Sequence, residues 1–187
     1  SALFGALFGL GRNEVAFYGN IRPGLPIPVP ETYHCEGSAS DYAMVLEDLA
    51  AEGSNFRELS SGCSLKEARE IVHALARLHA HYWQSPRFQT DLAFVNRLET
   101  DRDFRLVNLV RQLSVPIALK KYGTILPTEI LDVVPDLMRN YRRLEEHWAV
   151  EPRTLLHGDA HLGNMYFQGD RVGFFDWQVT QLGQGMR

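Results

Sequence analysis

Residue types that can bind a cation and move a proton are concentrated near the end of the sequence. Asp159 lies beside a glycine in the segment HGDAHLGN, Asn164 follows on the same loop, and Asp176 comes later in the segment FFDWQ. Phosphoryl transfer from ATP needs a carboxylate beside the acceptor hydroxyl and oxygen ligands for magnesium, with little further covalent chemistry. One carboxylate and one amide oxygen suit Mg²⁺, because this ion uses few protein ligands.

A predicted β-hairpin brings these residues together. Two short apolar runs, 165–167 and 172–175, are separated by a segment that contains the turn-forming pair Gly169-Asp170. A hairpin returns its two ends to neighbouring positions. We therefore expect Asp176 to face Asn164 across one cleft.

The same residues have alternative interpretations. A loop aspartate is often only a turn or capping residue, and this applies to Asp159 and Asp176. His157 is expected to brace the loop through a backbone hydrogen bond rather than to touch a substrate, and His161 is expected to act similarly. A metal cluster of His157, Asp159 and His161 would indicate a hydrolase, but the sequence offers no further His/Asp pair at ligand spacing.

The N-terminal part of the sequence is predicted to be helical and then extended. Apolar residues over 1–21 predict one helix, or two short ones broken near Gly9 and Gly11. The segment 22–31 holds four of the nine prolines and is expected to be an extended loop, since proline disfavours helix in the residue before it.

Two short strands are predicted next, at 32–36 and 41–47, with a turn at 37–40 between them. The segment 53–62 then has the composition of a loop. The order of elements is therefore helix, two strands, several helices, and a final loop with a hairpin. This order predicts an α+β fold with a small strand-containing lobe and a larger helical lobe.

Three or four helices are predicted between residues 64 and 152. Ser64 and Glu67 form a capping-box pattern at the start of the first helix. Its predicted apolar face comprises Leu65, Ala68, Val72, Leu75, His79 and Tyr82. A second helix is expected over 101–113, with a possible continuation after Pro116, and a third from Pro127. The third carries a stripe that we expect to be buried, formed by Ile130, Val134, Leu137, Tyr141, Leu144 and Trp148.

The composition excludes several classes of protein. The 187 residues carry a formal net charge of −4, which disfavours a nucleic-acid partner. Cys35 and Cys63 have no metal-ligand spacing and are expected to be lone buried thiols in a reducing cytoplasm. No apolar run reaches the roughly 20 residues that a membrane-spanning helix needs. We therefore expect a cytoplasmic protein without membrane contact.

The segments HGDAHLGN and FFDWQ resemble the HGDxHxxN and D-W motifs of the aminoglycoside-phosphotransferase/choline-kinase superfamily, most of all its ecdysteroid-kinase-like small-molecule kinases. The resemblance implies a protein-kinase-like two-lobed fold that uses ATP and Mg²⁺ to phosphorylate a hydroxyl of a small molecule. It also implies that Asp159 is the catalytic base, Asn164 a metal ligand and Asp176 the principal metal ligand.

Further residues resemble the nucleotide-binding parts of the family. MVLEDL resembles the hinge strand on which adenine lies, so Met44, Glu47 and Leu49 are expected to line the adenine site. GRNEVAFY resembles the helix whose glutamate pairs with the ATP-binding lysine, which implies this role for Glu14. The expected domains are an N-lobe remnant at 1–50 and a helical C-lobe at 51–187.

The sequence also departs from the family pattern. Its three lysines, Lys66, Lys120 and Lys121, all follow Glu14, and no glycine-rich phosphate loop precedes Glu14. We expect a fragment that lacks the phosphate loop, the lysine strand and the C-terminal helices, with weak or no activity by itself. The alternative is a non-catalytic nucleotide-binding pseudokinase module. The acceptor and the oligomeric state are not predicted.

Overall fold

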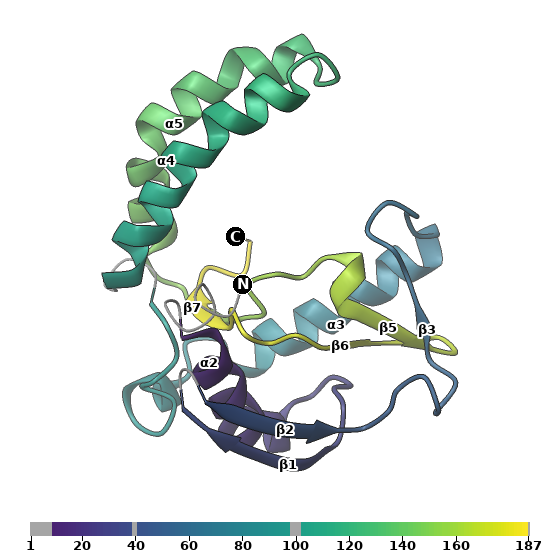
Figure 1. The fold of residues 1–187 in the computed structure, drawn as a ribbon. Helices are drawn as coiled ribbons and strands as arrows, with labels where there is room; N and C mark the ends of the chain where they lie inside the picture. The colour runs from purple at the N-terminus through teal and green to yellow at the C-terminus, as the bar shows by residue number, and fades with distance from the viewer. Residues whose placement is uncertain (1–8, 39–40, 98–101, 187) are drawn as a thin grey trace.

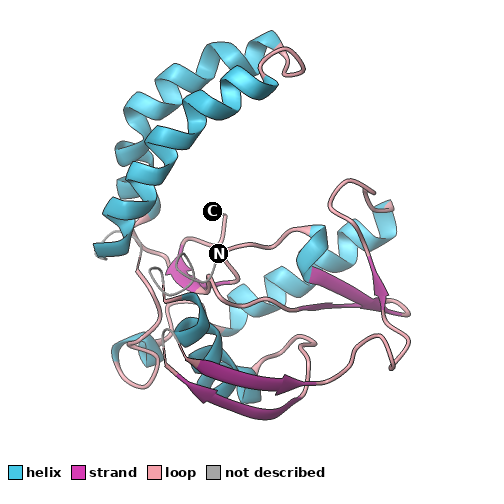
Figure 2. Cartoon of the chain, viewed as in Figure 1, coloured by secondary structure: helices cyan, strands magenta, loops and turns pink. Residues whose placement is uncertain are grey.

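The computed structural model describes residues 9–38, 41–97 and 102–186, and Figure 1 follows the chain through them. Helices are mixed with short antiparallel strands, which form three small sheets within the described residues (Figure 2). The expected α+β fold is therefore confirmed.

The N-terminal helical segment begins at Gly9, which has a left-handed φ of 63°. α2 (Leu10–Ala16) continues into a π-helical turn, Phe17–Ile21, and a 3₁₀ turn, Arg22–Gly24. The predicted helix is confirmed from residue 10 onward, and 1–8 lie outside the described residues.

β1 (Thr32–Gly37) and β2 (Tyr42–Leu46) pair antiparallel and confirm the two predicted strands, while residues 39–40 of the expected turn lie outside the description. The helix α2 lies against this pair of strands. Gly11 lies inside α2 and does not break it, whereas Gly9 precedes its first residue. A Cβ there would lie 2.0 Å from the Tyr42 ring, so glycine is required by a close approach to β2.

The capping box of α3 (Leu65–His81) is confirmed. The Glu67 backbone N–H donates to the Ser64 hydroxyl at 3.2 Å, and the Ser64 N–H donates to the Glu67 carboxylate at 2.7 Å. Two of the four orphan amides at this helix start are thereby satisfied.

The buried face of α3 differs from the predicted one. Ala74 and Leu78 are fully buried, whereas Leu65 and Val72 of the predicted stripe are 69% and 63% exposed. Tyr82, just past the helix end, is buried as predicted. Ala68, Leu75 and His79 are half-buried, so the prediction is wrong at Leu65 and Val72 and holds toward the end of the helix.

The predicted C-terminal hairpin is confirmed. β5 (Met165–Gln168) and β6 (Arg171–Phe174) pair antiparallel with Gly169-Asp170 as the two-residue turn. β3 (Asn55–Phe56) joins the free edge of β5 in the segment that was predicted to be a loop.

A second sheet of two strands supports the loop that follows. β4 (Thr154–Leu156) pairs antiparallel with β7 (Gln181–Gly183), and all three residues of β4 are buried. Strands of two or three residues are too short to show an alternating pattern, so β3, β4 and β7 were not predicted.

Two long helices form a hairpin that extends away from the rest of the molecule (Figure 1). α4 (Arg102–Tyr122) runs through Pro116, and α5 (Thr128–Trp148) begins directly after Pro127, as predicted. The expected burial of the α5 stripe is wrong at Ile130 and Leu137, which are 47% and 45% exposed, whereas its other four residues are half-buried.

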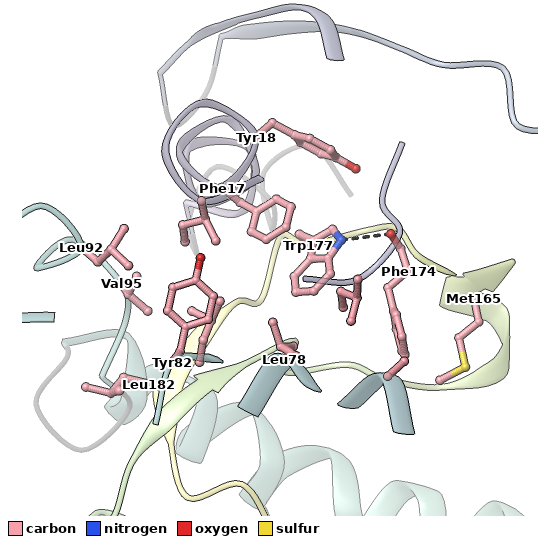
Figure 3. Packing of buried hydrophobic residues seen from close by; sticks show 14 of the residues in the cluster. Phe17, Tyr18, Leu78, Tyr82, Leu92, Val95, Met165, Phe174, Trp177 and Leu182 are labelled. Atoms are coloured by element: carbon pink, nitrogen blue, oxygen red, sulfur yellow. Dashed lines mark hydrogen bonds between the residues drawn. The ribbon is translucent and has the colours of Figure 1, made fainter. Parts of the chain in front are cut away.

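The main core lies where α3, the N-terminal helical segment and the C-terminal strands meet (Figure 3). A short 3₁₀ helix, Pro86–Gln89, contributes Phe88 to it. Trp177 lies at the centre, fully buried, with its indole N–H donating to the Phe174 carbonyl at 3.1 Å.

Both cysteines are free thiols. Cys63 is exposed rather than buried, because it lies in the loop before α3. Among the described residues, the helices that are long enough to cross a bilayer are not apolar enough to do so.

Candidate active site

The loop after β4 is in close backbone contact with the segment that follows Asp176. Gly158 has a φ of 87°, and a Cβ there would lie 2.1 Å from the Val179 carbonyl oxygen. Any other residue would need both a left-handed backbone and space that the Val179 carbonyl occupies. The glycine of HGD is therefore required by the contact between the two segments.

His157 connects the two segments through both ring nitrogens. Its Nε2 lies 3.0 Å from the Phe175 carbonyl oxygen, and its Nδ1 accepts the Asp159 backbone N–H at 3.3 Å. One neutral tautomer, protonated on Nε2, satisfies both bonds. Burial lowers the pKa of His157 to about 4, so the ring is neutral at physiological pH.

Asp159 and Asn164 are held together across the loop. The Asn164 Nδ2 donates to the Asp159 backbone carbonyl at 3.0 Å and to its carboxylate at 3.3 Å. His161 Nε2 lies 3.6 Å from the same carboxylate, which remains about half exposed. Asp159 thus has a fixed position and an open side toward the solvent.

Asp176 reaches the same place from the end of the hairpin. The Phe175 N–H donates to the Asn164 carbonyl at 3.1 Å, which joins the residue before Asp176 to the loop. Burial, and then the nearby negative charge of Asp159, raise the pKa of Asp176. The structure therefore brings Asp159, Asn164 and Asp176 into one cluster.

The donor atoms of this cluster fit a hard divalent cation. The nitrogen of the Asn164 amide is used by Asp159, so its Oδ1 is the atom able to bind an ion. Asp176 adds a half-buried carboxylate whose ionisation is opposed by its surroundings, and a cation would remove that penalty. A histidine cluster is different, because both nitrogens of His157 are already bonded. The described residues contain no group of three His, Cys, Asp or Glu side chains that could hold a metal.

Comparison with known proteins places this cluster in a family. Residues 6–184 match the sequence model of the phosphotransferase enzyme family. The chain belongs to this family. Among curated protein sequences none matches.

Among solved structures, the chain is similar to a thermostable mutant of aminoglycoside phosphotransferase APH(4)-Ia in ternary complex with ADP and hygromycin B. The TM-score is 0.48 at 12% identity, over 95% of this chain. The chain spans 58% of the length of that phosphotransferase.

In this member of the phosphotransferase family, Glu14 of α2 lies close to the cluster. Burial, followed by the charge of Asp176, raises the pKa of Glu14 to about 7, while a hydrogen bond from the Trp177 backbone N–H opposes the rise. Among the described residues, no lysine or arginine forms an ion pair with Glu14. Lys66 instead pairs with Asp170 at 2.5 Å.

The expected adenine residues lie at the end of β2 and just beyond it. Met44 packs against the core, and Leu49 is buried. The Leu49 N–H donates to the Glu47 carbonyl at 3.1 Å, and the Glu47 N–H donates to the Glu31 carbonyl at 2.9 Å. A base bound here by the Leu49 N–H would have to replace the bond to Glu47.

Phe17 and Asn13 contact the residues that follow Asp176 and were not predicted as part of the site. Phe17 stacks on Trp177 with ring centroids 4.1 Å apart, and His157 lies 4.4 Å from the same indole (Figure 3 shows the first pair). The Asn13 amide donates to the Gln178 carbonyl at 3.2 Å. The complete burial of Trp177 makes it a packing residue of the core. Asn13 gave no signal in the sequence, because its contact joins positions 165 residues apart.

Proposed function

We propose that this chain carries the catalytic centre of a kinase that uses ATP and Mg²⁺ to phosphorylate a hydroxyl group of a small molecule. Membership of the phosphotransferase family supports the reaction class. The single observation that supports the site is the convergence of Asp159, Asn164 and Asp176, linked by backbone bonds from His157 and Phe175.

In this proposal Asp159 orients the acceptor hydroxyl and takes its proton. Its carboxylate is about half exposed, so an acceptor can reach it. Asn164 and His157 fix its backbone and its side chain, and a general base must be within hydrogen-bond reach of the proton it removes. His161 lies beside the same carboxylate and supports its position.

Asn164 Oδ1 and Asp176 are the proposed magnesium ligands. Bound magnesium would neutralise the charge that develops on the transferred phosphoryl group. Asp176 supplies the charge for the ion, and Asn164 links the ion site to the loop of the base. In this proposal Asp159 and Asp176 act from two segments that the side chain of His157 joins.

The proposed nucleotide site uses the end of β2 and α2. Met44 and Leu49 would form its apolar wall, with the Glu47 carbonyl and the Leu49 N–H as hydrogen-bonding groups for adenine. These two groups are bonded to each other at 3.1 Å, so adenine would have to displace this bond to reach them. Glu14 would act on the nucleotide only through the ATP-binding lysine with which the family resemblance pairs it. Residues up to 50 would then act as the small lobe and later residues as the large lobe.

The test is a phosphorylation screen of the protein that carries this chain. It would be incubated with Mg²⁺-ATP and a library of hydroxyl compounds, and products would be read by mass increase. Asp159→Asn should lower kcat by about 10²–10⁴ while leaving nucleotide binding in place. Asp170→Asn, an exposed aspartate in the β5–β6 turn, is the matched control and should keep full activity. Equal activity of Asp159→Asn and the unaltered protein would refute the proposal.

One observation favours a second candidate, a non-catalytic nucleotide-binding module. Glu14 has no cationic partner among the described residues, although the family resemblance implies a lysine there. Such a module would give a thermal shift with Mg²⁺-ATP but no product with any acceptor and no ATP turnover. Turnover that depends on Asp159 would exclude it.

A further inference from the structure

Asp176 has an unusual backbone conformation for a residue with a side chain. Its φ is 62°, in the left-handed region, and besides the glycines only Gln84 shares this property among the described residues. Side chains are disfavoured there because Cβ approaches the following carbonyl oxygen, although aspartate tolerates it better than most. Neighbouring contacts must therefore hold the turn at Asp176 in place.

Those contacts come from one face of the N-terminal helical segment. Asn13 Nδ2 donates to the Gln178 carbonyl at 3.2 Å, and Phe17 stacks on Trp177 with an interplanar angle of 7°. Asn13 and Phe17 are four residues apart, which places them on the same side of a helix. Glu14, next to Asn13, lies close enough to the Trp177 backbone for that backbone to lower its pKa. The side chains of Asn13 and Phe17 thus contact the two residues that follow Asp176.

Asn13 differs from Phe17 and Glu14 because, among the described residues, its side chain forms a hydrogen bond only with the turn. Phe17 belongs to the buried core, and Glu14 lies beside the Asp176 charge. The Asn13 amide is half-buried and makes its bond only to the backbone of the turn. Asn20, on the next turns of the same segment, is exposed and donates to its own helix at Ala16. Asn20 is thus a control asparagine in the same segment, exposed and without a bond to the turn.

We propose that Asn13 is a positioning residue for the metal ligand Asp176. By fixing the Gln178 carbonyl, the Asn13 amide holds the turn in which Asp176 keeps its left-handed backbone next to Phe175, the residue bonded to Asn164. Asn13 touches neither ion nor nucleotide. The inference rests on the proposed function, because it assumes that Asp176 binds Mg²⁺.

The experiment compares Asn13→Leu with Asn20→Leu in the protein that carries this chain. Leucine is close in size to asparagine, removes the amide and adds no charge. It also favours helix more than asparagine does, so neither variant should lose helical stability. The readout is the Mg²⁺ concentration that half-saturates ADP binding, measured by calorimetry, together with the melting temperature without ligand.

Asn13→Leu should raise the half-saturating Mg²⁺ concentration about fivefold, the effect of losing one hydrogen bond of typical net strength. Asn20→Leu should leave it unchanged. Asn13→Gln, which keeps the donor on a longer side chain, should recover part of the loss.

Three results would overturn the inference. The first is an equal Mg²⁺ requirement in the two leucine variants. The second is a lower melting temperature for Asn13→Leu with an unchanged Mg²⁺ requirement, which would make Asn13 a purely structural residue. The third is ADP binding by the unaltered protein without any Mg²⁺ dependence. That result would contradict the proposed function itself, and it is seen before any variant is compared.

Discussion

The helices α3 and α5 have similar sequence patterns but very different surroundings. Both carry apolar residues at three- and four-residue spacing. α3 buries Ala74 and Leu78 against the core, whereas α5 leaves Ile130 and Leu137 nearly half exposed. An amphipathic pattern thus identifies side chains that share a helix face, but whether another element covers that face depends on contacts far away in the sequence.

The contact between α4 and α5 adds to this difference. Arg111 of α4 lies over the ring of Tyr141, and Glu145 of α5 is buried close to both. Leu113 and Ile117 of α4 are instead more than 60% exposed. Polar and cation–π contacts therefore connect the two helices, while much of their apolar surface faces outward.

The largest expected effect tests whether the two helices really differ in burial. Leu78→Ala should lower the free energy of unfolding by about 3 kcal/mol, because Leu78 is fully buried in the core. Leu137→Ala should change it by less than about 0.5 kcal/mol. Urea unfolding followed by circular dichroism measures both. A loss of equal size in the two variants would show that the α5 stripe is covered in solution.

A second effect distinguishes the core from the α4–α5 helix pair by the pH dependence of the free energy of unfolding. His157 has a folded-state pKa of about 4, below its ordinary value near 6.5, so the unfolded chain binds more protons between these values. The stability that the neutral His157 ring contributes to the folded state is therefore present above pH 6.5 and is lost as pH falls toward 4. We expect the His157 contribution to decrease by roughly 2 kcal/mol over this range, while Glu14, with its pKa raised to about 7, contributes with the opposite sign.

The His157 contribution is measured by unfolding at a series of pH values. His157→Asn should flatten this part of the pH profile, whatever its effect at neutral pH. His147→Asn, which alters an exposed histidine of α5, should keep the slope of the unaltered protein. An unchanged slope in His157→Asn would mean that the His157 ring is not held neutral by the fold.

The smallest expected effect concerns how the two helices begin. α3 starts with the Ser64 capping box, whereas α5 starts after Pro127 without a side-chain cap. Ser64→Ala should lower the melting temperature by a few degrees, in line with a loss of about 1 kcal/mol. Thr128→Ala, at the first residue of α5, should leave it nearly unchanged. Equal shifts would indicate that the capping box does not stabilise α3 in solution.

Local sequence signals predicted a large part of the fold. The Ser64–Glu67 pattern, the Gly169-Asp170 turn and the boundary at Pro127 each depend on residues close in sequence, and all three are confirmed. The failures depend on distant contacts. β3 pairs only with the edge that β5 offers, and Ile130 and Leu137 of α5 remain nearly half exposed.

The candidate site also has a part that local sequence signals predicted and a part that depends on distant contacts. Asp159, Asn164 and Asp176 were proposed to lie together because a hairpin connects them, and the structure brings them together. Their roles remain predictions. The two hydrogen bonds of the His157 ring and the contact of Asn13 with Gln178 depend on the approach of segments that are distant in the sequence. No local sequence pattern describes this approach.

The contact at Gly158 has a consequence for how the site can vary. Because a Cβ at this position would meet the Val179 carbonyl, even alanine would act as a wedge between the base-bearing loop and the segment after Asp176. Such a wedge would move the proposed proton acceptor relative to the proposed ion ligand without altering a single functional group. The spacing between the two is thus set by the absence of one methyl group.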